Sequence, residues 1–199
     1  MRSIAAAVRV AIVCFCKQDA SDLVRLDGVS STCVGPDLTV GLSLTGVTPL
    51  RANKGVSFIG TQKNGPFDIT GELARGWLLD PINPNGRPNA DVVRPWTNGS
   101  GLVRGDEDRW IIDFGTAMSE REAALYQGPF KYVFEHVRPT RLHLRRQWHR
   151  TKWWLHGDPR PALRRAIANG RGFVATPLVS KHRVFVWLPT QKIPENTVS

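Results

Sequence analysis

Features that commonly identify a secreted, membrane or metal-binding protein are scarce in this sequence. It contains 3 cysteines, Cys14, Cys16 and Cys33, an odd number without the paired spacing of a zinc site or a disulfide framework. No stretch reaches the roughly 20 apolar residues that a membrane span needs. The apolar opening run is interrupted by Arg9 and followed by Lys17, without a signal-peptide cleavage pattern. We therefore expect reduced, buried thiols in a cytoplasmic protein.

Catalytic motifs are missing as well. There is no phosphate-binding G-x-x-x-x-G-K-[ST] loop, no H-E-x-x-H motif and no other metal-ligand spacing. Asp91 and Asp113 are isolated carboxylates, which favours structural roles over paired acid–base chemistry. The 5 histidines share a stretch of chain with only two acidic residues. These absences favour a binding protein without metal ligands over an enzyme.

Acidic residues are almost absent from residues 131–183, where 13 lysines and arginines accompany only Glu135 and Asp158, a balance of +11. Residues 1–130 are nearly neutral, with 13 basic and 14 acidic residues. Such a concentration of like charge is costly unless a polyanion neutralises it, so nucleic acid is the expected partner. A solvated basic face is the alternative, and it explains small charge excesses better than one of this size.

The hydrophobic pattern predicts an α+β fold with a mixed or antiparallel sheet and flanking helices. Strands are expected at residues 6–16, 38–44, 55–60, 109–114, 172–175 and 183–188, with an extended segment at 92–96. Helices are expected at residues 72–79, 119–127, 130–137, 140–155 and 162–169. Ser119 and Glu122 have the spacing of a capping box. Residues 80–89 and 97–101 are predicted to be irregular, because proline, glycine and asparagine are frequent there.

The predicted helix at 140–155 carries basic residues on more than one face, which a core helix does not tolerate. This pattern suits a row of phosphates or a DNA groove, because guanidinium groups bridge phosphates or pair with guanine. Trp148, Trp153 and Trp154 lie in the same segment. For most of them, inward packing is favoured over stacking on bases.

Two further segments carry side chains that suit base reading. The loop at 83–96 is stiffened by prolines and displays the amide and guanidinium groups that read adenine and guanine in pairs of hydrogen bonds. A rigid turn in which asparagines cap backbone groups is an equal alternative for this loop. Residues 180–183 form a polar tip between two strands, which suits either entry into a groove or a solvated turn.

Five collinear blocks resemble one known family. They are NPNGRPNADVVRPWTNG (83–99), RWIIDFG (109–115), EAALYQGPFKYVFEHVRPTR (122–141), KWWLHGDPRPALRRAI (152–167) and VATPLVSKHRVFVWL (174–188). Together they resemble the target-recognition region of large bacterial DNA methyltransferases, specifically the MmeI-like, type IIL restriction–modification enzymes. Residues 5–16 also resemble the last strand of the α/β methyltransferase sheet in that family. The resemblance covers roughly residues 50–190.

The resemblance implies the end of a methyltransferase catalytic domain at residues 1–50, a DNA target-recognition domain at 51–190 and a truncated tail at 191–199. The family transfers a methyl group from S-adenosylmethionine to adenine N6, using a glycine-rich cofactor loop and an Asn-Pro-Pro-aromatic motif that holds the flipped base. Neither motif occurs here, since Asn83-Pro84-Asn85-Gly86 lacks the second proline and the aromatic residue. We therefore expect no catalytic residue and no cofactor in this chain. Its expected role is sequence-specific binding of double-stranded DNA in a bacterial cytoplasm, with a separate catalytic polypeptide as a possible second partner.

The predicted DNA contacts lie in the segments described above and in the helix at 162–169. Base contacts are predicted at Asn85, Arg87, Asn89, Arg94, Lys181, His182 and Arg183. Phosphate contacts are predicted at Arg141, Arg145, Arg146, Arg150, Lys152 and Arg164. Two alternatives stay open: a general RNA- or single-strand-binding protein, which requires exposed Trp148 and Trp153, and a non-functional remnant with exposed apolar edges.

Overall fold

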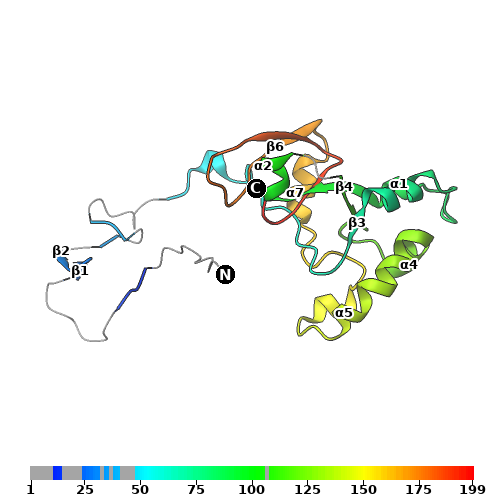
Figure 1. The fold of residues 1–199 in the computed structure, drawn as a ribbon, viewed down its shortest axis with the longest axis horizontal. Helices are drawn as coiled ribbons and strands as arrows, with labels where there is room; N and C mark the ends of the chain where they lie inside the picture. The colour runs from blue at the N-terminus through cyan, green and yellow to red at the C-terminus, as the bar shows by residue number, and fades with distance from the viewer. Residues whose placement is uncertain (1–10, 15–23, 32–33, 36–37, 41–47, 106–107) are drawn as a thin grey trace, which may run out of the picture. The chain divides into compact units, whose positions relative to one another are not determined.

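The computed structural model describes residues 11–14, 24–31, 34–35, 38–40, 48–105 and 108–199 (Figure 1). The chain forms two compact units, Met1–Lys54 and Gly55–Ser199. In the first unit, β1 (Val24–Leu26) and β2 (Val29–Ser31) form an antiparallel hairpin, and a short 3-10 helix, η2, spans Arg51–Asn53. Asp27 and Gly28 turn the hairpin with φ angles of 50° and 81°, a conformation that glycine adopts readily and aspartate tolerates.

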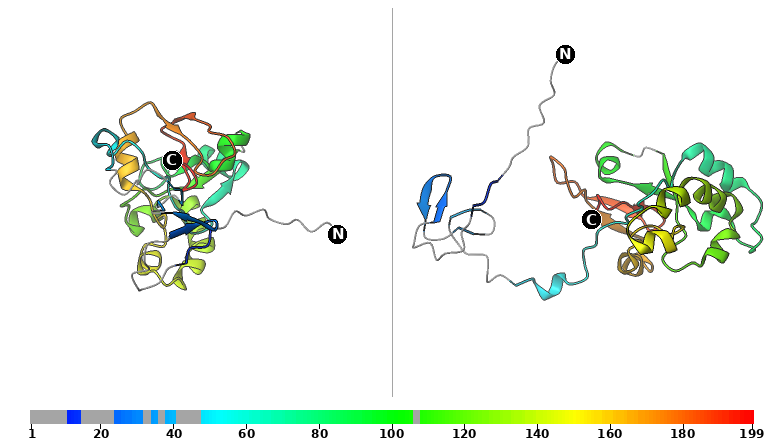
Figure 2. Two further views of the ribbon diagram at one scale, coloured as in Figure 1. Left: turned by 90° about the vertical axis from the view of Figure 1, so that its left-hand side faces the viewer. Right: turned by 90° about the horizontal axis from the view of Figure 1, so that it is seen from below.

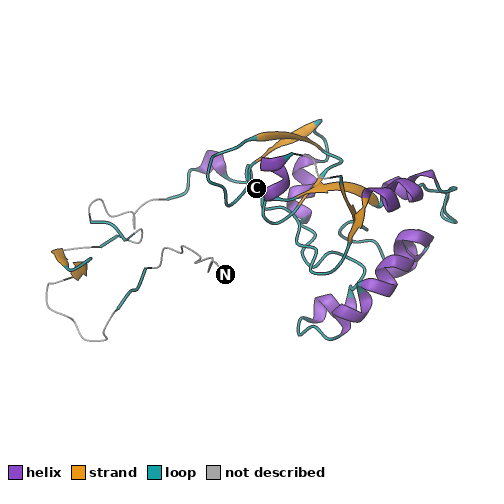
Figure 3. Ribbon diagram, viewed as in Figure 1, coloured by secondary structure: helices purple, strands orange, loops and turns teal. Residues whose placement is uncertain are grey.

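A four-stranded sheet runs through the second unit (Figure 3). Its order is β3 (Asp68–Thr70), β5 (Arg109–Ile112), β4 (Val93–Thr97) and β8 (Ile193–Pro194). The first three strands pair antiparallel, whereas β4 and β8 run parallel. The sheet is therefore mixed, and together with its flanking helices it confirms the predicted α+β class.

Helices surround this sheet, with α4 and α5 along one side of the unit (Figures 1 and 2). The helices are α1 (Gly71–Leu79), α2 (Gly99–Arg104), η3 (Asn89–Asp91), α3 (Glu120–Ala124), α4 (Gln127–His136), α5 (Arg138–Leu142), α6 (Gln147–Thr151) and α7 (Pro161–Ile167). One apolar core joins strands and helices and includes the buried aromatic residues Phe67, Phe114, Tyr126 and Trp153. Removal of these large side chains from water supplies the main driving force for folding.

The N-terminus of α3 confirms the predicted capping box. The Ser119 hydroxyl accepts a hydrogen bond from the Glu122 backbone N–H, and the Glu122 carboxylate accepts one from the Ser119 backbone N–H at 2.8 Å. Because this pairing satisfies two helix-end donors, Ser119→Ala should lower the free energy of unfolding by about 1 kcal/mol in urea titrations. Ser119→Asn, which keeps an acceptor, and Ser100→Ala, at an exposed position of α2, serve as controls. Equal stabilities of S119A and S100A would contradict the prediction.

Residues 193–199 are part of the folded second unit and not a tail. Ile193 and Val198 are buried, and Ser199 exchanges two backbone hydrogen bonds with Thr176. This segment also lies so close to Gly60 that a Cβ there would stand 2.2 Å from the Glu195 carbonyl oxygen. Only glycine fits such an approach of two backbones. The C-terminal residues therefore hold together parts of the chain more than 100 residues apart.

A two-stranded antiparallel ribbon, β6 (Gly172–Ala175) and β7 (Val186–Pro189), forms close to the residues predicted as strands. Phe173 lies opposite Leu188 on the inner face, where Leu188 is buried. Val174 lies opposite Trp187 on the outer face, and both are exposed. Side chains therefore alternate between the two faces of the ribbon, as the predicted strands require. Residues 183–185, which were predicted to be part of the second strand, belong to the loop.

Three predicted strands are not found in the described residues. The strand expected at 6–16 lies mostly outside them; its described part, 11–14, has no regular structure and is exposed, including Cys14, which was expected to be buried. Residues 38–40 and 55–60 are not strands either. None of the described residues of these segments belongs to a strand, although the Gly60 backbone N–H donates to the Val198 carbonyl oxygen. Cys16, Cys33 and residues 41–44 lie outside the described residues.

The turn predicted at 97–101 is the start of α2 instead. The Asn98 side chain accepts a hydrogen bond from the Gly101 backbone N–H at 2.8 Å and caps the helix, as asparagine commonly does. The glycines therefore do not prevent a helix that has a strong cap. Among the helices of the described residues, none is long and apolar enough to cross a membrane.

Candidate nucleic-acid interface

The basic segment predicted as one helix at 140–155 is two short helices, α5 and α6, joined by an exposed turn. The Arg150 guanidinium donates from Nη1 to the carbonyl oxygens of Leu144 and Arg145, at 2.8 and 3.0 Å. In a continuous helix these carbonyls would accept from backbone N–H groups four residues later. The prediction of a single helix is therefore wrong, and Arg150 stabilises the turn that replaces its middle.

We call residues 143–150 the basic turn. Arg145 and Arg146 are exposed, and their guanidinium groups make no hydrogen bond or ion pair with any described residue. The sequence between Glu135 and Asp158 contains no acidic residue that could neutralise them. Exposed cations without a protein partner are available to bind the phosphates of a polyanion. The basic turn is the place where the predicted phosphate contacts agree best with the geometry.

Arg141, predicted as a phosphate contact, is fully buried and has a structural role instead. Its guanidinium donates to the backbone carbonyls of Asn64 at 3.1 Å and Leu155 at 2.6 Å, and also to those of Lys63 and Lys152. Burial lowers its pKa to about 10, which leaves it charged near neutral pH. We therefore exclude Arg141 from the candidate interface.

Arg164, another predicted phosphate contact, forms a bidentate ion pair with Asp113 at 2.7 and 3.0 Å. Its side chain is 23% exposed and that of Asp113 only 3%. Burial by itself would raise the pKa of Asp113. The Arg164 charge, with smaller contributions from His156 and from hydrogen bonds of Arg164 and Gly115, instead holds that pKa at about 2. A guanidinium committed to a buried carboxylate is not available to DNA, so the prediction for Arg164 is wrong.

His156 lies beside this pair, with Nδ1 at 3.9 Å from the Asp113 carboxylate. Its Nε2 is 2.9 Å from the Ile112 carbonyl oxygen, which can only accept, so Nε2 carries the hydrogen. Burial lowers the pKa of His156. The ring is therefore neutral near neutral pH and its role is structural. Among the described residues, no three histidine, cysteine or carboxylate side chains gather as a metal site requires.

The tryptophans of this region confirm the expectation of inward packing for most of them. Trp153 is 4% exposed and Trp154 is also buried, whereas Trp148 is 38% exposed. The Trp148 Nε1 approaches the His156 carbonyl oxygen at 3.4 Å. Lys152, a predicted phosphate contact, is half-buried with its ammonium 5.1 Å from the Trp154 ring centre. The single-strand alternative requires both Trp148 and Trp153 as stacking platforms, and Trp153 is not available.

The loop before β4 contains one base-contact candidate that points into solvent. The Arg87 side chain is 65% exposed, and its Nε contacts the Asp91 Oδ2 at 2.6 Å. The Asn85 Oδ1 accepts from the Arg87 backbone N–H at 3.1 Å, which closes a local turn. Asn85 itself is half-buried. The alternative of asparagines that stabilise the loop is therefore right for Asn85, whereas Arg87 stays accessible.

Asn89 and Arg94 are tied down by the fold. Asn89 is 4% exposed; its amide donates to the Trp77 carbonyl oxygen at 3.0 Å and accepts from Asn83 at 2.9 Å. The Arg94 Nε donates to the Gln191 carbonyl oxygen at 3.2 Å. A buried amide with its polar atoms satisfied cannot read a base edge, so the prediction for Asn89 is wrong. Arg94 is half-buried, and its predicted base contact stays a prediction.

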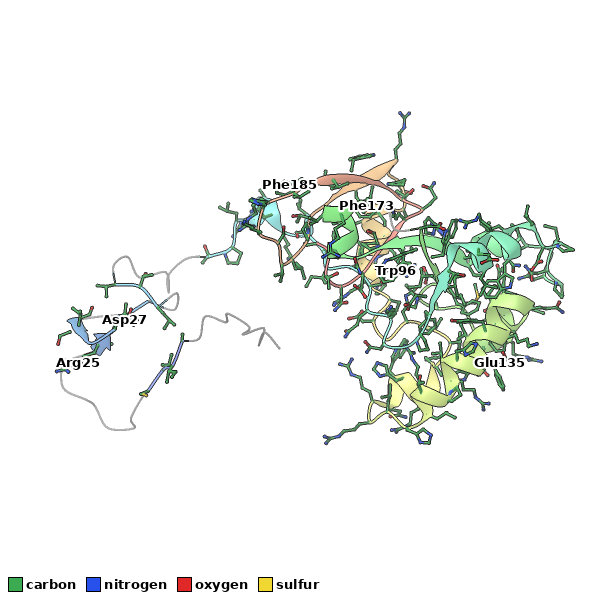
Figure 4. All side chains as sticks on the ribbon, in the orientation of Figure 1. Arg25, Asp27, Trp96, Glu135, Phe173 and Phe185 are labelled. Carbon is green, nitrogen blue, oxygen red and sulfur yellow. The ribbon has the colours of Figure 1, made fainter. Side chains whose placement is uncertain are left out.

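The tip of the β6–β7 hairpin carries Lys181, His182 and Arg183, all exposed. The Ser180 hydroxyl contacts the His182 carbonyl oxygen at 2.6 Å and its backbone N–H at 3.3 Å, which stabilises the tip. Phe185 follows, and it is exposed next to the hairpin (Figure 4). An exposed basic loop at the end of an antiparallel ribbon is compatible with entry into a DNA groove, which stays a prediction.

The three predicted contact segments do not converge on one spot. The loop at 80–88 and the loop after β6 lie at opposite ends of the unit, and α5 lies on the side away from β6 (Figures 1 and 2). A backbone hydrogen bond from Gln127 to the Asn83 side chain joins the 80–88 loop to the start of α4, and α5 follows α4. The basic turn and the Arg87 loop are therefore linked through α4, and the hairpin tip is a separate surface.

Three features of this region were not predicted from the sequence. Arg87 and Asp91 have the i, i+4 spacing of an ion pair, so inspection of local charge spacing could have found them. The other two features join residues far apart in the chain. Arg141 contacts the Asn64 carbonyl across 77 residues, and Arg164 contacts Asp113 across 51. For those long-range pairs the sequence contains no signal.

No protein-family model and no curated protein sequence matches this chain. A solved structure of the type IIL restriction–modification enzyme MmeI in complex with DNA has a similar fold, with a TM-score of 0.53 and 14% sequence identity. The match covers 85% of this chain and 22% of the MmeI chain. This chain therefore spans about a fifth of the length of that enzyme, with which it shares a related fold.

Proposed function

We propose that the unit Gly55–Ser199 binds double-stranded DNA and provides target recognition for a site-specific adenine-N6 DNA methyltransferase of a restriction–modification system. The observation that carries the proposal is the basic turn, with Arg145 and Arg146 exposed and without protein partners. It lies on a fold related to that of an enzyme solved with DNA. Phosphate neutralisation by such side chains supplies most of the affinity of DNA-binding proteins.

The methyl donor of such enzymes, S-adenosylmethionine, carries a positive charge and ribose hydroxyl groups, which commonly pair with carboxylates. A hollow of about 470 Å³ opens between residues 55–58, α7 and the β6–β7 ribbon, and no aspartate or glutamate lines it. The residues of this hollow do not fit the donor, and the glycine-rich cofactor loop of such enzymes does not occur in the sequence. We expect calorimetric titration of the chain with S-adenosylmethionine to show no binding, and methyl transfer to depend on a catalytic partner polypeptide or domain.

Removal of two cations from the basic turn should weaken binding to every duplex. Replacement of Arg145 and Arg146 by alanine is expected to lower affinity roughly 10-fold or more between about 50 and 200 mM salt. The slope of the logarithm of the binding constant against the logarithm of salt concentration should fall by about two, because two phosphate contacts are lost. Fluorescence anisotropy with random-sequence duplexes across a salt series measures both quantities.

A matched control removes the same charge elsewhere. Arg104→Ala combined with Arg171→Ala takes one cation each from α2 and from the turn before β6, where both side chains are exposed. If this control variant loses as much affinity as the variant in the basic turn, net charge and not a defined surface governs binding. A loss confined to one DNA sequence would contradict the phosphate role. Tighter binding to single strands than to duplexes would favour the single-strand alternative.

A further inference from the structure

Arg87 is held in one orientation by neighbouring polar groups. Its Nε contacts the Asp91 Oδ2 at 2.6 Å, and the same carboxylate oxygen accepts from the hydroxyl of the buried Tyr126 at 3.3 Å. The backbone at Arg87 is fixed by the Asn85 side chain and by the proline that follows. The Arg87 Nη1 and Nη2 atoms make no hydrogen bond with any described residue, and the side chain is mostly exposed.

An arginine held in this way presents a planar fork of N–H donors at low entropic cost. A fork of this kind binds two adjacent acceptors, either two phosphate oxygens or the O6 and N7 atoms of guanine. Because the Asp91 carboxylate already neutralises much of the guanidinium charge, attraction to a phosphate is weakened. The directional hydrogen bonds remain, and they favour a neutral pair of acceptors.

There is room for such a partner beside Arg87. A hollow of about 430 Å³ is lined by Asn85, Arg87 and Tyr126, together with Met118 and Leu125. Glu122 lies at the same hollow, and a second carboxylate close to the fork makes the site still less attractive to a phosphate. The surroundings therefore match the edge of an uncharged base better than the DNA backbone.

The position of Arg87 is compatible with a duplex that also contacts the basic turn. The ten residues of α4 span about 15 Å at the usual helical rise, and α4 connects the Asn83 contact to α5. One turn of B-form DNA extends over roughly 34 Å. The α4 part of the path between the two surfaces is therefore shorter than one helical turn of DNA.

We propose that Arg87 reads a guanine in the DNA target and that Asp91 and Tyr126 are positioning residues for its guanidinium. This inference rests on the duplex binding proposed above. It adds one specificity-determining contact, from Arg87 to a guanine edge. It also adds two residues that act by orienting Arg87. Asp91 and Tyr126 touch Arg87 or its carboxylate partner and need not touch DNA.

Selection of bound duplexes from a random library, followed by affinity measurements on single-base variants, tests the inference. Arg87→Ala and Asp91→Asn should both lose a guanine preference at one position of the selected sequence, by about 5- to 150-fold. Tyr126→Phe should lose part of it. The salt dependence and the melting temperature should stay near those of the wild-type chain for Arg87→Ala and Asp91→Asn, because the ion pair lies at the surface. Asp108→Asn, which breaks the exposed Arg75–Asp108 pair on another loop, is the matched control.

Each other result overturns a stated part of the inference. A uniform loss over all sequences in R87A, with a salt slope lower by about one, would identify a phosphate contact and overturn guanine reading. Loss of the preference in R87A but not in D91N would overturn the positioning role. An unchanged preference in both variants would overturn the inference while leaving duplex binding intact. Absence of duplex binding by the wild-type chain would overturn the proposed function first, and the inference with it.

Discussion

Replacement of Arg141 by alanine is expected to lower the free energy of unfolding by about 4 kcal/mol. Four carbonyl oxygens, from Lys63, Asn64, Lys152 and Leu155, accept from its guanidinium in the interior. Alanine would leave these acceptors without a donor and remove the stacking of the guanidinium on Phe67, whose ring centre is 5.0 Å away. A buried acceptor without a partner costs about 1–3 kcal/mol, so several together account for the size of the loss.

Arg141→Lys separates charge from geometry. An ammonium keeps the charge but not the planar fork that reaches both the 63–64 and the 152–155 segments, so we expect a loss of about 2–3 kcal/mol. Urea unfolding, with the midpoint compared at a constant slope, measures both variants. Arg145→Ala, four residues away and exposed, is the control and should stay within about 0.5 kcal/mol of wild type. A lysine variant as stable as wild type would show that the fork is not what stabilises the interior.

Asp113→Ala is the second substitution with a large expected effect, about 3 kcal/mol of lost stability. It would leave Arg164 without its bidentate partner and the Gly115 backbone N–H without the acceptor that it has at 3.0 Å. Removal of one member of a buried ion pair costs more than the pair itself contributes, because the remaining charge keeps its desolvation penalty. Arg75→Ala, which breaks the exposed pair with Asp108, should cost much less and is the control.

The same pair predicts how stability depends on pH. The pKa of Asp113 is about 2 in the folded state, below its ordinary value of 3.8. A carboxyl group with a lowered pKa contributes stability that is complete above its unfolded pKa, so this contribution, about 2 kcal/mol, should disappear as the pH falls from about 4 to 2. Burial also lowers the pKa of His156. The unfolded chain therefore binds that proton first, and stability should start to fall as the pH drops below about 6.5.

Urea titrations at several pH values between about 2 and 7 test both contributions. His156→Gln should remove the decrease that begins below about pH 6.5 and keep the one below about pH 4, whereas Asp113→Asn should flatten the curve below about pH 4. Steeper acid denaturation in D113N than in wild type would contradict the sign argued here. Because neither residue lies in the basic turn, His156→Gln should bind duplexes like wild type at a pH where it is folded.

Local elements of the fold were predictable wherever one short motif determines them. The capping box at Ser119 starts α3 as expected, and α1 begins within one residue of the helix predicted at 72–79. The strand predicted at residues 109–114 is found at 109–112, and the helix predicted at 162–169 is found as α7. The predictions at 55–60 and 97–101 were wrong because they relied on composition. Composition does not show whether a neighbouring strand pairs with a segment or whether a side chain caps a helix.

The candidate site was predictable only in part. Charge segregation identified residues 131–183 as the basic region, and the exposed Arg145 and Arg146 lie within it. The same pattern assigned Arg141 and Arg164 to phosphates, although one donates to backbone carbonyls and the other to a carboxylate. In a sequence, an arginine directed inward and one directed outward look alike, because spacing within a segment does not report what the rest of the chain brings to it.

The sequence by itself determined the α+β class, the helix starts and the concentration of positive charge, because these depend on residues close together in the chain. Tertiary structure alone decided which cations remain available to a partner. Asn64, Asp113 and Leu155 reach Arg141 and Arg164 across separations of up to 77 residues. Those contacts remove two arginines from the surface and leave Arg145, Arg146 and Arg87 on it, since a guanidinium can leave water only where buried acceptors replace the lost hydration.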